Sequence, residues 1–411
     1  MCGIVAFVDN EDPKVKDSLI RKMKNRIIHR GPDSEGQYVD ENVALGFRRL
    51  SFIDVKSGNQ PIFNEDNSMA IEFNGEIYNF KELREELIDL GHTFKTHADT
   101  EVILHGYEQW GDDVLKRLRG MFAFVIWDFK NKDMFGARDH FGIKPLYYGK
   151  MNGTFFVGSE IKAFIDHPHF DKELNKNALK PYMTFQYSAT QETFFKGIYK
   201  LPEGHCFHYK DGQFNMKEYW DADFDPKDEG FDKAVDNIED IVTDSVKAHS
   251  FADKGIKVGS FLSAGVDSSY VTAMMRPDNT FSIGFDSTYD ETKQARELAA
   301  KLNLKNTDAK LTNEEAFHYY LDEPDSNPSV IPLYFLTRLA KENGYKAMLS
   351  GEGADELFAG YIDYGFNSNS MLIRWFTDKL RELPQAKRYK IAKWLDGKHF
   401  HGQLHMFRAL A

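Results

Sequence analysis

The chain has 411 residues, which predicts at least two domains, and its formal net charge of −12 argues against nucleic acid or an anionic membrane as a partner. Apolar residues make up 42% and charged residues 28% of the chain, enough for large buried cores. The sequence has no apolar run of transmembrane length, no secretory-signal pattern and only two cysteines, so we expect a cytoplasmic protein without a disulfide framework.

The first half of the chain predicts many short strands and a few helices. Asn79 and Glu82 have the spacing of a capping box, and Gly91 is placed to end the helix that follows. A second helix is predicted over residues 100–110, before Gly111. Apolar or alternating runs predict strands at residues 44–47, 69–73, 121–129 and 154–157.

The pattern changes after an acidic segment at residues 221–230, which contains Pro and Gly and predicts a linker. Alternation of helix and strand then predicts an α/β domain with a parallel sheet covered on both faces. Its predicted helices are 231–250, one starting at Ser268, 291–302, 331–343 and one starting at Asp355; its predicted strands are 257–262, 280–285 and 346–350. The predicted domains are therefore 2–220 and 231–365, followed by a basic helical tail at 366–411.

Cys2 directly follows the initiator methionine. Methionine is normally removed before a small residue, so the mature chain is expected to begin with a cysteine that carries both a thiol and a free α-amine. An α-amine has a pKa of about 8, so it is partly neutral in the cell and is able to accept the thiol proton. One residue would then supply both the nucleophile and the base. Cys206 lies in a predicted strand and is expected to be a buried small apolar residue.

Polar residues elsewhere in the first half suit the cleavage of a carboxamide by that thiolate. Asn74 and the backbone N–H of Gly75 are candidate donors to a tetrahedral oxyanion. Arg49 is a candidate clamp for an α-carboxylate, and Glu76 and Asp99 are candidates for holding an α-ammonium. Each feature alone has a plainer explanation, such as a hairpin turn at Asn74–Gly75 or a surface ion pair at Arg49. Their combination behind an N-terminal cysteine favours the hydrolase.

Several segments resemble the glutamine amidotransferase domain of glutamine-dependent asparagine synthetases. The segments are Met-Cys-Gly-Ile at 1–4, His-Arg-Gly-Pro-Asp at 29–33, Arg-Leu-Ser-Phe-Ile-Asp at 49–54, Asn-Gly-Glu-Ile-Tyr-Asn at 74–79, and the runs at 120–124, 138–146 and 159–163. The resemblance implies an α+β N-terminal-nucleophile hydrolase fold, an αββα sandwich. It also implies that Cys2 is the nucleophile, that Asn74 and Gly75 form the oxyanion hole, and that Arg49, Glu76 and Asp99 bind glutamine.

In the second half, two loops each follow a predicted strand and open a predicted helix. Residues 261–269 read Phe-Leu-Ser-Ala-Gly-Val-Asp-Ser-Ser, without the Gly-Lys-Ser/Thr ending of a loop that transfers the γ-phosphate. Such a loop suits binding of pyrophosphate with Mg²⁺, with Asp267 as a metal ligand, or is a simple capped turn. Residues 350–356 form the second loop, in which Asp355 is a candidate for the second metal carboxylate.

Both loops resemble the ATP-pyrophosphatase half of the same family. The resemblance implies that Glu352 acts near the acyl-adenylate as a general base toward ammonia. It also implies an ATP site made of Phe261, Ser263, Gly265, Asp267, Ser268, Ile283, Ser350 and Gly351. Two departures stand out. Ala264 replaces a family glycine, which predicts strain if that position has a positive φ. The family pattern also continues beyond the length of this chain, so we expect an incomplete acceptor pocket.

The resemblance therefore implies an asparagine synthetase that hydrolyses glutamine at Cys2 and passes ammonia to β-aspartyl-AMP made from aspartate and ATP with Mg²⁺. The products would be asparagine, glutamate, AMP and pyrophosphate. Two alternatives stay open at this point: amidation of another carboxylate, such as a peptidoglycan precursor, and a glutaminase-only or regulatory relic. A homodimer is possible. His399, His401 and His405 lack a nearby carboxylate or cysteine in the sequence and are weak metal candidates.

Overall fold

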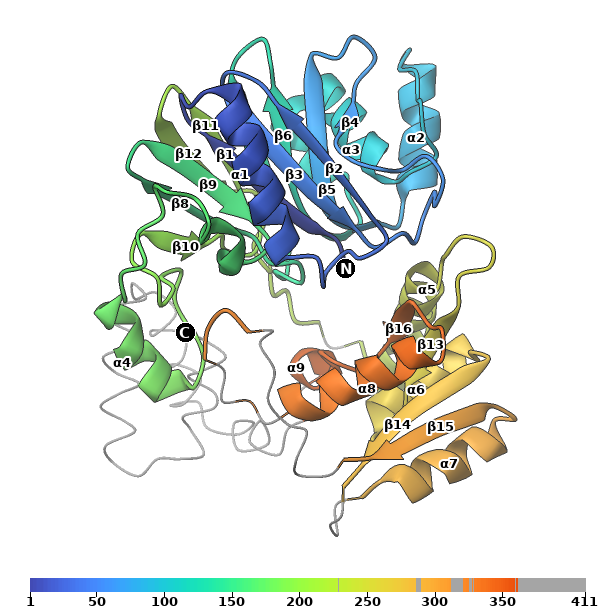
Figure 1. Ribbon diagram of the computed structural model, residues 1–411. Coiled ribbons are helices and arrows are strands. Elements are labelled where there is room, and N and C mark those ends of the chain that lie inside the picture. Colours follow the sequence, from blue (N-terminus) through green and yellow to red (C-terminus); the bar gives the residue numbers. More distant parts are fainter. Residues whose placement is uncertain are drawn as a thin grey trace.

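The computed structural model describes residues 1–227, 229–285, 290–311, 321–324, 327, 329–358 and 360 (Figure 1). The predicted tail at 366–411 and residues 361–365 of the predicted second domain lie outside the described residues.

Two six-stranded antiparallel sheets form the centre of the first domain (Figure 1). The first has the order β10-β8-β9-β1-β3-β2 and is built from β1 (Gly3–Val8), β2 (Ser34–Val39), β3 (Val43–Arg49), β8 (Tyr147–Met151), β9 (Thr154–Gly158) and β10 (Ile198–Lys200). The second has the order β12-β11-β7-β6-β5-β4 and is built from β4 (Ile62–Phe63), β5 (Met69–Ile77), β6 (Gly120–Asp128), β7 (Asp133–Arg138), β11 (His205–Lys210) and β12 (Gln213–Glu218).

Helices cover the outer face of each sheet. Helix α1 (Pro13–Arg26) packs on β1, β2 and β3, whereas α3 (Thr100–Trp110) packs on β4 and β5 and contacts α2 (Phe80–Asp89). Three buried apolar clusters fill the layers: one between α1 and the first sheet, one between the two sheets, and one between the second sheet and its helices. This is the αββα arrangement expected from the sequence. Shorter elements complete the domain: η1 (Gly111–Lys116), η2 (Ile161–Phe164) and α4 (Lys176–Phe185).

The predicted C-terminal ends of α2 and α3 are confirmed, whereas the predicted N-terminal cap of α2 is not. Gly91 and Gly111 follow the two helices with φ of +103° and +57°, where glycine has no Cβ penalty. The predicted capping box is wrong, because the Asn79 side chain makes no cap hydrogen bond. Its amide instead donates to the Arg117 carbonyl and accepts from the Arg119 N–H, so a tertiary contact replaces the local one.

The second domain contains a four-stranded parallel sheet in the order β15-β14-β13-β16. The strands are β13 (Val258–Phe261), β14 (Asn279–Gly284), β15 (Lys305–Lys310) and β16 (Ala347–Leu349), and the helices are α5 (Phe231–His249), α6 (Val266–Met275), α7 (Thr292–Lys301), α8 (Val330–Glu342) and α9 (Ala354–Phe358). The predicted parallel α/β sheet is confirmed. Edge strand β15 was missed, since its sequence Lys-Asn-Thr-Asp-Ala-Lys has no apolar pattern and only the neighbouring strand reveals it.

Several apolar side chains along α5 are exposed. Val246 is buried, whereas Val235 and Ile238 are 45% and 41% exposed. Helix α5 contacts α6. The helix predicted at residues 231–250 is confirmed, with bounds at Phe231–His249.

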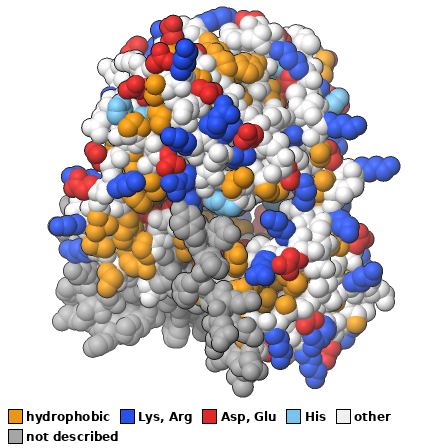
Figure 2. Space-filling view, viewed as in Figure 1, with side chains coloured by type: hydrophobic (Ala, Val, Ile, Leu, Met, Phe, Trp, Pro, Cys, Tyr) orange, Lys and Arg blue, Asp and Glu red, His pale blue; other side chains and the backbone are white. Residues whose placement is uncertain are grey.

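Polar contacts join the two domains. Lys346 Nζ, just before β16, lies 2.6 Å from an Asp33 carboxylate oxygen, and Arg119 pairs with Asp244 of α5. The Val55 N–H donates to the Asp253 carboxylate at 3.3 Å. Figure 2 shows Lys, Arg, Asp and Glu side chains interspersed over this face of the first domain, as the moderate net charge suggests. Among the described residues, no helix combines the length and apolarity needed to span a membrane.

Candidate active sites

Cys2 lies immediately before β1 and is held there by backbone contacts. Arg30 Nε donates to the Cys2 carbonyl at 2.9 Å, and β1 pairs with β3 from Gly3 onward. The Cys2 Sγ lies 3.7 Å from the Leu50 carbonyl oxygen. Burial raises the pKa of the Cys2 thiol and lowers the pKa of the Met1 α-amine to about 5. The Met1 α-amine is therefore neutral at pH 7 and has a lone pair to accept a proton.

A small cavity of about 40 Å³ opens at this thiol. Its lining includes five of the six residues predicted for the glutaminase site: Cys2, Arg49, Gly75, Glu76 and Asp99. The remaining lining residues are Leu50, Phe52, Ile53, Gly58, Gln60, Phe73, Ala98 and Thr100. Four segments that are separated in the sequence, at Cys2 and at residues 49–60, 73–76 and 98–100, thus converge at one cavity.

Asn74 is the sixth predicted residue and precedes Gly75 on β5. Strand side chains alternate between faces, and Ala70 of the same strand packs in the core between the two sheets, so Asn74 faces that layer as well. It is 1% exposed, and its Nδ2 has no hydrogen-bond partner within the described part of the chain. A buried amide donor without an acceptor is costly and rare in proteins, and such a donor is available to a developing oxyanion.

Gly75 is required by the packing of β5 on β6. A Cβ at this position would lie 2.1 Å from the Met121 carbonyl oxygen and 2.8 Å from the Phe122 Cα. No other residue fits without moving the strand. The neighbouring strand β6 is therefore the constraint that requires glycine at this position.

Arg49 is 5% exposed, and its guanidinium is oriented by the loop that follows it. The guanidinium donates to the carbonyl oxygens of Ile53, Asp54 and Val55 at 3.0, 2.6 and 3.2 Å. These acceptors are neutral, so the contacts fix its geometry while leaving its charge available for a carboxylate.

Asp99, which is buried, and Glu76, which is half-buried, are acids that line the same cavity. Asp99 accepts the Ile77 N–H at 2.9 Å, and burial raises its pKa to about 6. Burial and the nearby Asp99 charge raise the pKa of Glu76 to about 8. A bound ammonium would offset the cost of ionising both groups, so this pair is suited to a cationic group.

In the second domain, the two predicted loops meet at the carboxyl ends of adjacent strands. β13 and β16 are neighbours in the sheet, and the chain order reverses between them, which is where ligands bind in parallel sheets. A Cβ on Gly351 would lie 2.6 Å from the Ser268 N and 2.8 Å from the Asp267 Cβ. The predicted ATP-binding loops are therefore in contact.

Hydrogen bonds within the first loop give it a defined shape. Ser263 Oγ accepts the Gly265 N–H at 3.0 Å and lies 2.8 Å from Ser268 Oγ, while the Ala264 N–H donates to Glu291 at 3.0 Å. Gly265 has a φ of −69° and Ala264 is not among the residues with positive φ. The strain expected from Ala264 is therefore absent. Helix α6 begins at Val266, two residues before the predicted start.

The remaining predicted residues surround this junction. Phe261 ends β13 and Ile283 lies in β14, both half-buried. Asp267 and Asp355 lie in the first turns of α6 and α9. Ser350 and Glu352 are exposed on the second loop, where the Glu352 N–H lies 3.4 Å from Ser350 Oγ. Two half-buried carboxylates beside hydroxyl and N–H donors suit Mg²⁺ bound together with phosphate oxygens.

Comparison with known proteins agrees with this geometry. Residues 1–220 match the model of the glutamine amidotransferase domain family. The chain belongs to this family. Residues 237–410 match the asparagine synthase family, so the resemblance noted in the sequence is confirmed.

Curated relatives are similar to this chain over most of its length. Asparagine synthetase [glutamine-hydrolyzing] 1 of Bacillus subtilis is 42% identical over an alignment of 380 positions that covers 89% of this chain and 59% of that protein. A putative asparagine synthetase [glutamine-hydrolyzing] of Mycobacterium tuberculosis is 37% identical over an alignment of 400 positions that covers 89% of this chain and 61% of that protein. The chain thus spans about 60% of the length of these relatives. A solved glutamine PRPP amidotransferase of B. subtilis covers 90% of this chain at 14% identity, with a TM-score of 0.42 that supports no conclusion.

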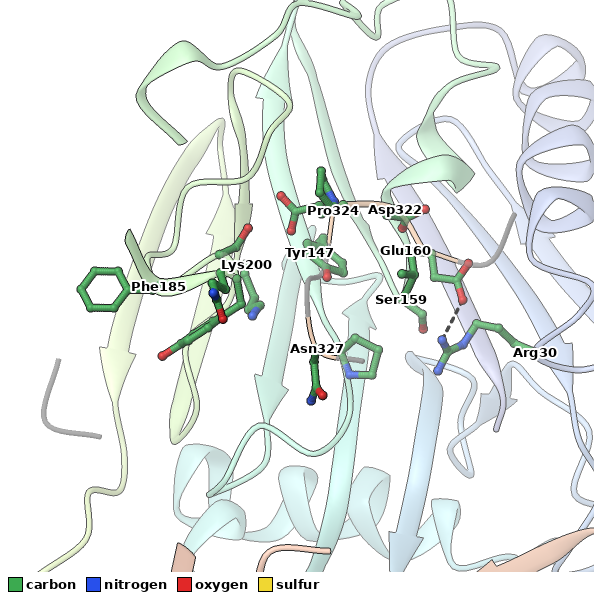
Figure 3. Close-up of a pocket in the computed structure, with 15 residues that line it drawn as sticks. Arg30, Tyr147, Ser159, Glu160, Phe185, Lys200, Asp322, Pro324 and Asn327 are labelled. Carbon is green, nitrogen blue, oxygen red and sulfur yellow. Dashed lines mark hydrogen bonds and ion pairs between the residues drawn. The ribbon is translucent and has the colours of Figure 1, made fainter. Parts of the chain in front are cut away.

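A larger cavity of about 660 Å³ lies between the two domains (Figure 3). Arg30 and Glu160 of the first domain and Asp322 and Glu323 of the second contribute to its wall. Asp322 accepts the Ile161 N–H at 2.6 Å, and Glu323 accepts the Phe194 N–H at 2.7 Å. The short segment that contains Asp322 is thereby tied to the first domain.

Arg30 and Glu160 are functional candidates to which the sequence assigned no role. Arg30 Nη1 lies 2.8 Å from Glu160, which also bonds His29 and Lys162. Hydrogen bonds from His29 and Lys162, together with the Arg30 charge, hold the pKa of Glu160 down to about 2. Arg30 both holds the Cys2 carbonyl and faces the large cavity. Both residues lie in segments that resemble the glutamine amidotransferase domain, at 29–33 and 159–163. That resemblance was the one feature of the sequence that could have identified them as candidates.

Proposed function

We propose that this chain acts as a glutamine-hydrolysing asparagine synthetase, an ATP-dependent carbon–nitrogen ligase. The observation that carries the proposal is the single cavity that brings Cys2 together with Arg49, Gly75, Glu76 and Asp99. The contact between the loops at Gly351 and Asp267 supports a nucleotide site in the same chain. The relatives named above support the overall reaction.

In the proposed first step, removal of Met1 places the free α-amine on Cys2 itself, beside Sγ. The amine takes the thiol proton, and the thiolate attacks the side-chain amide carbon of glutamine. Asn74 Nδ2 and the Gly75 N–H donate to the oxyanion, ammonia departs with the proton, and water hydrolyses the thioester to glutamate. Glutamine and water thus give glutamate and ammonia.

The same cavity would position the amino-acid end of glutamine. Arg49 binds the α-carboxylate, because its guanidinium is oriented by neutral carbonyl groups and keeps its charge available. Asp99 and Glu76 bind the α-ammonium. Their raised pKa values mean that the empty site is incompletely ionised near pH 7, so glutamine binding is coupled to proton release.

In the second domain, ATP is proposed to bind at the junction of the two loops. Phe261 and Ile283 lie beside the base, and Ser263, Gly265, Ser268, Ser350 and Gly351 donate to the phosphates. Asp267 and Asp355 would hold Mg²⁺, which neutralises charge on the departing pyrophosphate. Glu352 is placed to accept a proton from ammonia as it attacks β-aspartyl-AMP.

Ammonia is proposed to travel between the sites inside the protein. At neutral pH, ammonia in water becomes ammonium, which has no lone pair for attack. A path sheltered from bulk water keeps it reactive. Cytoplasmic location and a homodimer remain expectations.

The test compares two nitrogen donors. Cys2→Ala is expected to abolish asparagine synthesis from glutamine and to leave synthesis from added ammonium chloride within about twofold of the parent. Loss of both activities in a folded variant would contradict separate sites. Pyrophosphate release is then measured with aspartate, with other carboxylate acceptors and with none. Release that depends on aspartate supports the proposal, release with another acceptor indicates a different ligase, and none indicates a glutaminase alone.

A further inference from the structure

Four side chains outside both sites form a compact group on the first domain: Glu65, His92, His105 and Glu108, the His–Glu cluster. Glu65 lies in the turn between β4 and β5, and His92 follows the end of α2. His105 and Glu108 are three residues apart on α3 and therefore share one helix face. Three chain segments are joined here.

The cluster has the dimensions of a four-coordinate metal site. Each residue offers one ligand atom, and all four atoms lie within 4.8 Å of one another. His92 Nδ1 is 3.1 Å from Glu65, and His105 Nδ1 is 3.2 Å from Glu65 and 2.9 Å from Glu108. Zinc–ligand bonds of about 2.0–2.1 Å imply tetrahedral edges of about 3.3 Å between ligand atoms. Modest adjustment of the side chains would accommodate an ion.

The outer nitrogen of each imidazole already faces an acceptor. His105 Nε2 lies 3.4 Å from a Glu101 carboxylate oxygen, and His92 Nε2 lies 3.2 Å from the Gln109 side-chain oxygen. These acceptors are able to hold a hydrogen on each Nε2, and each Nδ1 is then the atom that faces the carboxylates and would face an ion bound among them. An imidazole held by a carboxylate on its far side is the usual arrangement of a metal-binding histidine.

The carboxylates are oriented in the same way. Glu65 Oε1 accepts the Thr93 N–H at 3.0 Å, and Glu108 Oε1 accepts from the Asn64 amide at 2.6 Å. His105 is fully buried, whereas the side chains of an ordinary surface ion pair are exposed to solvent. Supported ligands with little freedom favour ion binding, because less entropy is lost when the ion arrives.

We propose that the His–Glu cluster binds one divalent transition-metal ion, Zn²⁺ in preference to Mg²⁺ or Ca²⁺, in a closed structural site. Two imidazole nitrogens and two carboxylate oxygens suit Zn²⁺, whereas the hard cations prefer oxygen alone. Four protein ligands leave no open position for chemistry.

The ion would fasten the loop that leads into the glutamine cavity. Glu101, behind His105, also accepts the Lys95 and Thr96 N–H groups at 2.7 Å each. That loop continues to Ala98 and Asp99, which line the cavity at Cys2. Metal binding is therefore expected to raise the thermal stability of the first domain.

The experiment uses the full 411-residue chain after removal of metal with a chelator. Calorimetric titration with ZnCl₂ is expected to show one equivalent bound, with a rise in Tm, and Co²⁺ is expected to give the intense visible absorption of a tetrahedral site. Glu65→Gln and Glu108→Gln should each weaken Zn²⁺ binding at least about tenfold and remove the tetrahedral Co²⁺ spectrum. Glu85→Gln, at an exposed position on α2, is the matched control and should bind as the parent does.

A second control separates this site from other histidines in the chain. The triple variant His399→Gln, His401→Gln, His405→Gln should keep the one-equivalent site. Circular dichroism of the glutamate variants checks that they are folded. Absence of Zn²⁺ binding in the parent, undiminished binding in both glutamate variants, or loss of binding in the triple variant would each overturn the proposal, and the cluster would then be a protonated ion-pair network.

Discussion

Replacing Asn74 by leucine should separate catalysis from stability, because the two effects have opposite signs at this residue. The side chain is 1% exposed and its Nδ2 has no partner in the described chain, so the folded protein loses no hydrogen bond from that donor. Leucine has a similar volume and removes the cost of an unsatisfied buried donor, about 1–3 kcal/mol. The free energy of unfolding should therefore stay equal or increase.

Catalysis should decline strongly in the same variant. Removal of one oxyanion donor typically lowers kcat by about 10²–10³, equivalent to about 2.7–4 kcal/mol in the barrier. The assay is glutamate release from glutamine at saturating substrate, together with urea unfolding of the same samples. Synthesis driven by added ammonium chloride should remain near the parental rate, because the second site is untouched.

Asn64 supplies the matched control. It is an equally buried asparagine beside the same sheet, but its amide donates to Ser68 and Glu108 and its oxygen accepts the Met69 N–H. Asn64→Leu should lower the free energy of unfolding by about 1–3 kcal/mol and change kcat little. If Asn74→Leu destabilises the protein as Asn64→Leu does, or keeps its glutaminase kcat, the assignment of Asn74 as an oxyanion donor is refuted.

Three further predictions concern buried or interdomain groups. Burial raises the pKa of Glu72, whose carboxylate has no partner within the described residues. The free energy of unfolding is therefore highest below about pH 4.5 and decreases as the pH rises toward the folded-state pKa of Glu72. Glu72→Gln should reduce this decrease, which urea unfolding at pH 5 and pH 8 would measure. Gly75→Ala should lower the free energy of unfolding by about 1–3 kcal/mol or more, because its Cβ would lie 2.1 Å from the Met121 carbonyl oxygen; thermal unfolding measures this, and an unchanged Tm would show that β5 and β6 separate easily. Lys346→Met removes the 2.6 Å ion pair between the domains that Lys346 forms with Asp33. The ratio of asparagine made to glutamate released should fall by up to about fivefold, because a partly exposed ion pair contributes about 1 kcal/mol at most. An equal fall in glutaminase kcat would indicate damage at the first site instead.

Local patterns in the sequence predicted most helices and strands correctly. They failed where contacts with distant segments determine the local structure. Gly91 and Gly111 end helices because a positive φ is a property of the residue itself. Strand β15 was missed because its polar sequence becomes a strand only beside β14. The Asn79 cap failed because two backbone groups from a distant loop compete for its amide. The same reason explains why the His–Glu cluster was not predicted, since its ligands come from three segments.

By itself, the sequence determined which reactive groups this protein carries: a cysteine at position 2 that is expected to become N-terminal, an arginine and two acids that are proposed to bind an amino acid, and two Ser- and Gly-containing loops after strands. Residue identity and local spacing carry that information, because nucleophilicity, charge and turn formation are local properties. The tertiary structure decided which of these groups share a cavity, that Arg30 contacts Cys2 and also faces the space between the domains, and that Asn74 has no partner among the described residues. These features depend on packing between segments far apart in the chain, and burial, which sets the pKa of Glu76 and Asp99, exists only once that packing has formed.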